Sequence, residues 1–157
     1  MLGLAAAAIV VAAVVGLFVM PTGASSATAV VPEGERVRTT AVVRDAQVML
    51  LTRNDTMHLL VAYERDGGWH GVSVAPPPAD SAAAWAATRG GTGVPPMSAV
   101  YGRADAARVK VAWADGTTNE APIVRGTWLV ARPGHVRSKS VTVLAADGAV
   151  VSTIEGP

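Results

Sequence analysis

Cysteine is absent from the 157-residue sequence, and its absence excludes several kinds of site at once. The chain has no disulfide bridge, no thiol nucleophile, no zinc or iron–sulfur site built on cysteine, and no lipid-modified cysteine anchor. A domain of about 120 residues can nevertheless bury enough apolar surface to be stable without such cross-links. The absence of cysteine leaves the redox compartment of the protein undecided.

Charge is also scarce, and none of it lies at the front of the chain. The 13 basic and 12 acidic residues make up 16% of the sequence, their formal net charge is +1, and the first of them is Glu33. Because proteins that bind nucleic acid usually carry a strongly basic face, we expect no nucleic-acid partner. The hydrophobic fraction of 50% is too high for a wholly disordered chain. The sequence therefore divides into an uncharged leader and an ordinary globular domain.

The leader, residues 1–29, contains the one long apolar run of the chain, from Leu2 to Met20. As a helix this run is about 28 Å long, which nearly matches the hydrocarbon core of a membrane. Pro21 then ends the helix, because proline cannot continue it. We therefore predict a membrane anchor that leaves the C-terminal domain outside the cytoplasm.

A cleaved signal peptide is the alternative interpretation of the leader. Ala27-Thr28-Ala29 matches the small-residue motif of a cleavage site, and cleavage after Ala29 would produce a secreted protein. The apolar run is longer than the usual length of about 7–15 residues, and no lysine or arginine precedes it. These two departures from a signal peptide favour the anchor.

Residues 30–35 are expected to form a short linker, and residues 36–157 carry the signals of a β domain. Short segments with alternating apolar residues are separated by turn dipeptides, a pattern typical of all-β proteins. The predicted fold class is an N-terminal hydrophobic helix followed by an all-β, antiparallel β-sandwich, either immunoglobulin-like or a small barrel. Strands are expected at Val37–Val43, Gln47–Thr52, Met57–Glu64, Trp69–Ala75, Ser98–Arg103, Arg108–Trp113, Thr118–Val124, Thr127–Ala131, Ser140–Ala145 and Ala149–Ile154.

The Asp66-Gly67 turn predicts a hairpin whose register can be stated residue by residue. As a two-residue loop it places Tyr63 opposite His70. In this register one face of the hairpin is mainly apolar and the other is mixed. The face expected in the core holds Met57, Leu59, Val61, Tyr63, Val72 and Val74. The opposite face holds His58, Leu60, Glu64, Trp69 and Ser73.

Three further turns are expected, a two-residue loop at Arg125-Gly126, a three-residue loop at Asp115-Gly116-Thr117, and a loop at Asp147-Gly148. The expected partners across them are Ile123 and Trp128, Val111 and Ala121, Val109 and Ile123, Val141 and Ile154, and Ala145 and Val150. The first two turns keep one set of apolar side chains on a single side, namely Val109, Val111, Trp113, Ala121, Ile123, Trp128 and Val130.

A segment rich in proline and glycine, residues 76–96, connects the first four expected strands to the remaining six. Ser81 is a suitable N-cap and Gly90 a suitable C-terminal residue for one short helix over Ala82–Arg89. We favour a crossover between two sheets of one sandwich, because a lobe of about 40 residues buries too little apolar surface alone. A flexible linker between two lobes is the alternative.

No motif predicts a catalytic, cofactor-binding or metal-binding residue. The segment from Gly71 to Ala75 is one residue away from a G-x-S-x-G nucleophile elbow, but Ser73 lies within an alternating strand rather than on a strand–helix turn. His58 and His70 are expected on opposite faces of their hairpin, so they cannot share a zinc ion. We therefore expect no catalytic residue, no metal and no cofactor.

A basic patch is the first candidate for an interaction surface. It consists of Arg132, His135, Arg137 and Lys139, and the last three alternate so that they share one face of an extended segment. Such a patch attracts anionic polymers or lipid headgroups by about 1 kcal/mol for each basic residue. A solvated strand without a partner is the simpler interpretation.

Two tryptophans, Trp69 and Trp85, are the second candidate, because both are expected outside the predicted core face. An exposed indole can contact a sugar or a protein partner. In the simpler interpretation, Trp85 covers the open end of the sandwich and Trp69 packs under it.

The function favoured by these patterns is an exported, membrane-anchored, non-catalytic binding or scaffolding module of the cell envelope. Its expected partners are the membrane, through Leu2 to Met20, and an envelope protein or an anionic polymer. The alternatives are a small envelope hydrolase with an unrecognised site, and a carrier that holds a lipid or another small ligand between its sheets.

Overall fold

The computed structural model describes residues 27–74, 77, 81–91 and 93–157, so the predicted leader helix lies outside the described residues. Within these ranges, no helix is long and apolar enough to cross a membrane. The elements are η1 (Ala27–Val30), β1 (Arg36–Val43), β2 (Ala46–Arg53), β3 (Thr56–Arg65), β4 (Gly68–Val74), β5 (Ala83–Thr88), β6 (Met97–Arg103), β7 (Arg108–Trp113), β8 (Thr118–Pro122), β9 (Thr127–Pro133), β10 (Ser138–Leu144) and β11 (Val150–Glu155).

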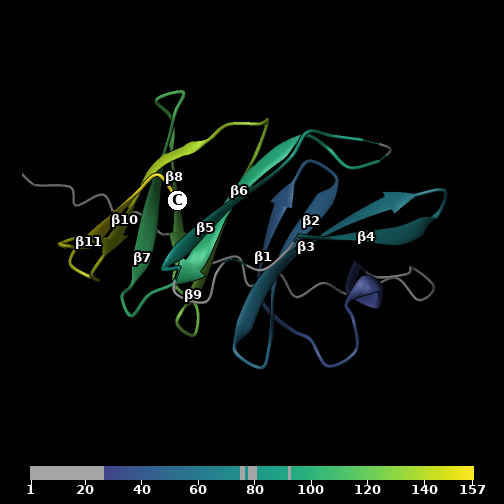
Figure 1. Ribbon diagram of the computed structural model, residues 1–157, viewed down its shortest axis with the longest axis horizontal. Coiled ribbons are helices and arrows are strands. Elements are labelled where there is room, and N and C mark those ends of the chain that lie inside the picture. The colour runs from purple at the N-terminus through teal and green to yellow at the C-terminus, as the bar shows by residue number, and fades with distance from the viewer. Residues whose placement is uncertain (1–26, 75–76, 78–80, 92) are drawn as a thin grey trace, which may run out of the picture.

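The described part of the chain is all-β, and every strand pairing is antiparallel, as predicted. The strands form three sheets, which we call the N-terminal sheet (β1-β2-β3-β4), the middle sheet (β5-β6-β9) and the C-terminal sheet (β11-β10-β7-β8). Figure 1 shows them in sequence across the molecule, with the middle sheet between the other two. The fold therefore has three layers rather than the two expected for a simple sandwich.

The middle sheet is buried on both of its faces, because alternate side chains point toward different neighbours. On β6, Met97, Ala99 and Tyr101 join the core shared with the N-terminal sheet. Val100, between them, joins the core shared with the C-terminal sheet. All residues of β6 except Arg103 are buried. A strand without alternation in polarity is what a sheet covered on both sides requires.

Gly102 on β6 shows how closely the layers pack. A Cβ atom at this position would lie 2.4 Å from the carbonyl oxygen of Ala82 and 2.8 Å from the Trp128 ring. Trp128 is fully buried, so neither its ring nor the backbone beside it has space to move. Glycine here makes room for a fully buried tryptophan at the contact between the middle and C-terminal sheets.

The predicted helix over Ala82–Arg89 is wrong, because this segment forms strand β5. All six of its residues pair with β6, from Ala83 opposite Gly102 to Thr88 opposite Met97. Alanine favours helices, but an isolated helix of eight residues is only marginally stable, and packing against a sheet outweighs that preference. The small side chains suit a strand at the edge of the middle layer, where Ala86 reaches one core and Trp85 the other.

The register predicted for the first hairpin is confirmed. Tyr63 pairs with His70, Val61 with Val72, and Leu59 with Val74. Asp66 and Gly67 both have positive φ angles, 52° and 75°, as the favoured two-residue hairpin turn requires.

The loop between β7 and β8 has three residues, as predicted, but the register differs by two. Val109 pairs with Ala121 and Val111 with Asn119. The backbone N–H of Trp113 donates to the carbonyl of Thr117, so the loop begins one residue earlier than expected. Because a shift of two residues keeps each side chain on its face, the predicted core face survives.

The predicted pairing of Ile123 with Trp128 is wrong, because β8 and β9 belong to different sheets. The tight turn at Arg125-Gly126 does form, and Val124 bridges Thr127 across it. Beyond this bridge β9 leaves β8 and pairs with β6. The apolar side chains expected on one side nevertheless meet in one core, since the two sheets face each other.

The last hairpin matches the prediction at one end only. Val141 pairs with Ile154 as expected, but Leu144, rather than Ala145, pairs with Val150. The register shifts between Val143 and Leu144, so Val151 is an extra residue in β11. Such a bulge bends an edge strand and leaves the extra residue unpaired.

The N-terminal sheet is also covered on the face turned away from the middle sheet. Ala27 of η1 is 3% exposed and packs with Met49, Leu51 and Leu60 in a third apolar cluster. Gly71 on β4 makes room for this cover, because a Cβ there would lie 3.3 Å from the Cβ of Val30. The segment before the predicted β domain is thus part of the folded structure.

Candidate functional site

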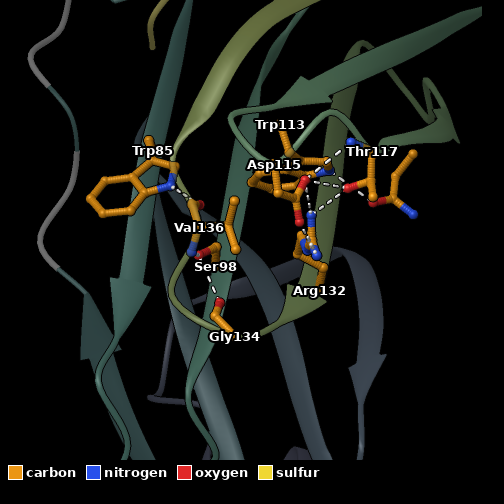
Figure 2. A network of polar contacts seen from close by, with 9 residues as sticks. Trp85, Ser98, Trp113, Asp115, Thr117, Arg132, Gly134 and Val136 are labelled. Atoms are coloured by element: carbon orange, nitrogen blue, oxygen red, sulfur yellow. Dashed lines mark hydrogen bonds and ion pairs between the residues drawn. The ribbon is translucent and has the colours of Figure 1, made fainter.

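Two arginine–tryptophan pairs organise the polar contacts near the predicted basic patch. One joins Arg137 to Trp85, and the other joins Arg132 to Trp113. Figure 2 shows the contacts around Trp85 and those around Arg132 in one view. The two pairs differ in burial and in charge, so they can serve different purposes.

The loop between β9 and β10 carries the arginine of the first pair, and a buried serine on β6 positions this loop. Ser98 on β6 is fully buried, and its hydroxyl donates to the carbonyl of Gly134 at 2.9 Å. The same hydroxyl accepts the backbone N–H of Val136 at 2.7 Å. The backbone N–H of Gly134 donates to the carbonyl of Pro96, which adds a second anchor. The loop is therefore fixed to the middle sheet at both of its central peptides (Figure 2).

Trp85 on β5 adds a further contact to this loop. Its indole Nε1 donates to the carbonyl of Val136 at 3.1 Å. The Arg137 guanidinium carbon lies 4.8 Å from the centre of the Trp85 ring, and the His135 ring meets that ring edge-on at 5.5 Å. His135 and Arg137 are exposed, whereas Trp85 is half-buried. We call Trp85, His135 and Arg137 the Trp85 cluster.

Arg137 carries a charge that no described carboxylate compensates. Among the described residues, no carboxylate lies within ion-pair distance of its guanidinium. Contact with an aromatic face orients a guanidinium without neutralising it. The Trp85 cluster therefore presents an oriented cation to solvent, which is the elementary requirement for binding an anionic group.

Arg132 is neutralised within the protein. Its Nη2 lies 2.8 Å from Oδ2 of Asp115, and its Nη1 donates to Asp115 Oδ1 at 3.1 Å and to Thr117 Oγ1 at 2.6 Å. The hydrogen bonds from Arg132 and then from Thr117 hold the pKa of the Asp115 carboxyl well below its usual range. The guanidinium also lies 5.3 Å from the centre of the Trp113 ring, which is buried. This second pair clamps the β7–β8 hairpin to β9.

The predicted basic patch is thus divided. The structure brings His135 and Arg137 together on Trp85 and turns Arg132 toward Asp115. Lys139 is exposed, and the register shift between Ser138 and Ser140 makes it the extra residue of a bulge in β10. The two-residue alternation expected for His135, Arg137 and Lys139 does not continue through that bulge.

The two tryptophans proposed for the surface lie on different layers. Trp69 packs with the apolar cluster under η1, and Trp85 packs beside the core of the C-terminal sheet. The expected packing of Trp69 under Trp85 is therefore wrong. No role was predicted for Ser98, which anchors the loop between β9 and β10. A single serine among the apolar residues of β6 is a pattern that indicates a buried polar contact.

His58, His70 and Ser73, the polar residues considered for metal or catalytic chemistry, all lie in the N-terminal sheet. Within the described ranges, no cluster of three or more histidine or acidic side chains could hold a metal ion. His58 pairs with Leu51 and His70 with Tyr63, on opposite faces of the sheet as predicted. Ser73 is exposed in the middle of the β3–β4 ladder, opposite Leu60.

Comparisons with protein-family models, with curated proteins and with solved structures find no match to this chain.

Proposed function

We propose that the protein is an exported, membrane-anchored, layered all-β module that binds an anionic polymer of the cell envelope without catalysis. The apolar leader supplies the anchor, and the Trp85 cluster supplies the binding surface. The observation that carries the proposal is the Arg137 guanidinium, oriented by Trp85 at 4.8 Å and left without a carboxylate partner among the described residues.

The layered fold supports this proposal by holding the surface rigid. The loop carrying His135 and Arg137 is anchored by Ser98 and by the Trp85 indole, so little ordering is needed when a ligand binds. A preformed site loses less conformational entropy than a flexible one. Exposed arginine recognises phosphate and carboxylate groups through paired N–H donors, which suits a polymer with repeated anionic groups.

Binding to soluble polymers tests the proposal directly. The full-length chain in nanodiscs of neutral lipid is titrated with fluorescent polyphosphate and polygalacturonate, with uncharged dextran as a control, and anisotropy is measured. We expect salt-sensitive binding of at least one anionic polymer and none of dextran. Arg137→Gln should weaken it about fivefold, the equivalent of about 1 kcal/mol. Arg53→Gln, which removes an exposed arginine on the N-terminal sheet, should leave it unchanged.

Two results would contradict the proposal. Equal loss of binding in Arg137→Gln and Arg53→Gln would mean that the polymer responds only to total charge. Binding to nanodiscs containing phosphatidylglycerol, with no binding to either polymer, would identify a lipid surface as the ligand instead.

A further inference from the structure

Edge strands of a sheet carry unpaired backbone N–H and C=O groups that can join another strand. The three sheets have six edge strands, β1, β4, β5, β8, β9 and β11. Native proteins protect such edges with charges, prolines or bulges.

Five of the six edges carry a protective feature or lie beside one. The strands β1 and β11 contain bulges, at Arg38 and at Val151. A proline ends β8 and another ends β9. The strand β5 lies under the charge of Arg137, which stacks on Trp85.

The strand β4 carries no charge, proline or bulge, and η1 packs on its face at Gly71 but leaves its edge without a paired strand among the described residues. Its seven residues, Gly68–Val74, include no proline and no aspartate, glutamate, lysine or arginine. Its ladder with β3 runs without a register shift from Arg65 opposite Gly68 to Leu59 opposite Val74. Among the described residues it pairs with β3 alone, and Val72 is 38% exposed. The edge is regular, uncharged and partly apolar.

The sequence of β4 is complementary to itself around Gly71. In an antiparallel pair of two β4 strands centred on this glycine, His70 lies opposite Val72 and Trp69 opposite Ser73. No charged side chain meets another across this pair. Trp69 and Val30 already share the cluster under η1, so pairing extends this apolar surface across both copies.

We propose that β4 pairs with β4 of a second copy of this chain, which joins two N-terminal sheets into one continuous sheet. The interface is symmetric about a two-fold axis, as expected for a homodimer. This proposal is independent of the Trp85 cluster, which lies on another sheet.

Cysteine substitution tests the interface, because the chain has no cysteine of its own. His70→Cys and Val72→Cys chains, each full-length, in detergent and with a different tag, are mixed and oxidised. The proposed register brings the Cβ atoms of these positions to about 5 Å, near disulfide range. We expect a cross-linked heterodimer from the mixture and little from either variant alone. A mixture of Ser152→Cys and Thr153→Cys, on the bulged edge strand β11, is the matched control and should not cross-link.

A charge at the edge provides the second test. By light scattering, Val72→Lys should reduce the mass of the protein component about twofold, from dimer to monomer, while Val151→Lys on β11 should leave the dimer intact. Circular dichroism verifies that both variants are folded. A monomeric wild-type chain would overturn the proposal. A dimer that survives Val72→Lys, or cross-links equally through β11, would do the same.

Discussion

Arg132 and Arg137 both stack on tryptophan, yet their surroundings assign them opposite tasks. Arg132 has a carboxylate, a threonine hydroxyl and a buried indole around it. Its charge is therefore neutralised by contacts that hold β9 to the β7–β8 hairpin. Arg137 has a half-buried indole and no carboxylate partner among the described residues. A cation–aromatic contact therefore reveals a function only when the remaining partners of the cation are counted.

The largest effect should come from the tryptophans. Trp113→Ala removes a side chain that is 1% exposed, and we expect it to lower the free energy of unfolding by about 3–5 kcal/mol. Trp85→Ala should cost less, because that indole is only half-buried. Urea denaturation followed by circular dichroism measures both values. Equal losses would contradict the division into a structural and a surface pair.

Removing the serine under the loop should have the next largest effect. Ser98→Ala leaves the carbonyl of Gly134 and the N–H of Val136 without their shared partner. Unpaired groups cost about 1–3 kcal/mol when buried, and these two are partly buried, so we expect a loss near the lower end of that range. Polymer binding should also weaken because the loop loses its anchor. Ser152→Ala, at an exposed position on β11, is the control and should change neither stability nor binding. A stable Ser98→Ala variant with normal binding would show that the loop needs no such support.

The two arginines should separate stability from binding. Arg137→Gln should weaken binding of the anionic polymer about fivefold with little change in stability. Arg132→Gln should lower stability, because Asp115 loses its partner, and leave binding almost unchanged. Anisotropy titration and urea denaturation of the same two preparations give both readouts. The reverse pattern would exchange the roles of the two pairs.

The smallest effect is a pH dependence confined to the Arg132 pair. Because the pKa of Asp115 is lowered in the folded protein, its contribution to stability is present above the unfolded pKa of about 4. The contribution is lost as the pH falls through the folded pKa. The stability difference between wild type and Asp115→Asn should therefore shrink below about pH 4, as measured by urea denaturation across pH. A difference that is constant with pH would mean that the Asp115 charge contributes nothing.

Local turn chemistry predicted much of the fold. The positive φ angles available at Asp66-Gly67 fix the register of the β3–β4 hairpin, and the sequence states that register correctly. Pairings between distant segments could not be predicted in this way. β9 pairs with β6 rather than with β8 because of packing in the middle layer. The same packing makes Ala83–Thr88 a strand, although the sequence predicts a helix there.

The candidate site was predictable only in outline. The sequence places four basic residues close together. It cannot show that Asp115, 17 residues before Arg132, neutralises Arg132 and not the other three. Nor can it show that β5 brings Trp85 to Arg137, since the strand itself was predicted as a helix. Charge compensation across layers is a property of the tertiary structure.

The packing of η1 on the N-terminal sheet has a mechanical consequence. Ala27 and Val30 are held in the apolar cluster beneath β2, β3 and β4, so the chain is attached to the sheet within one turn of residue 27. A force that reaches residue 27 is therefore transmitted to these strands through η1, before it reaches the segment between η1 and β1.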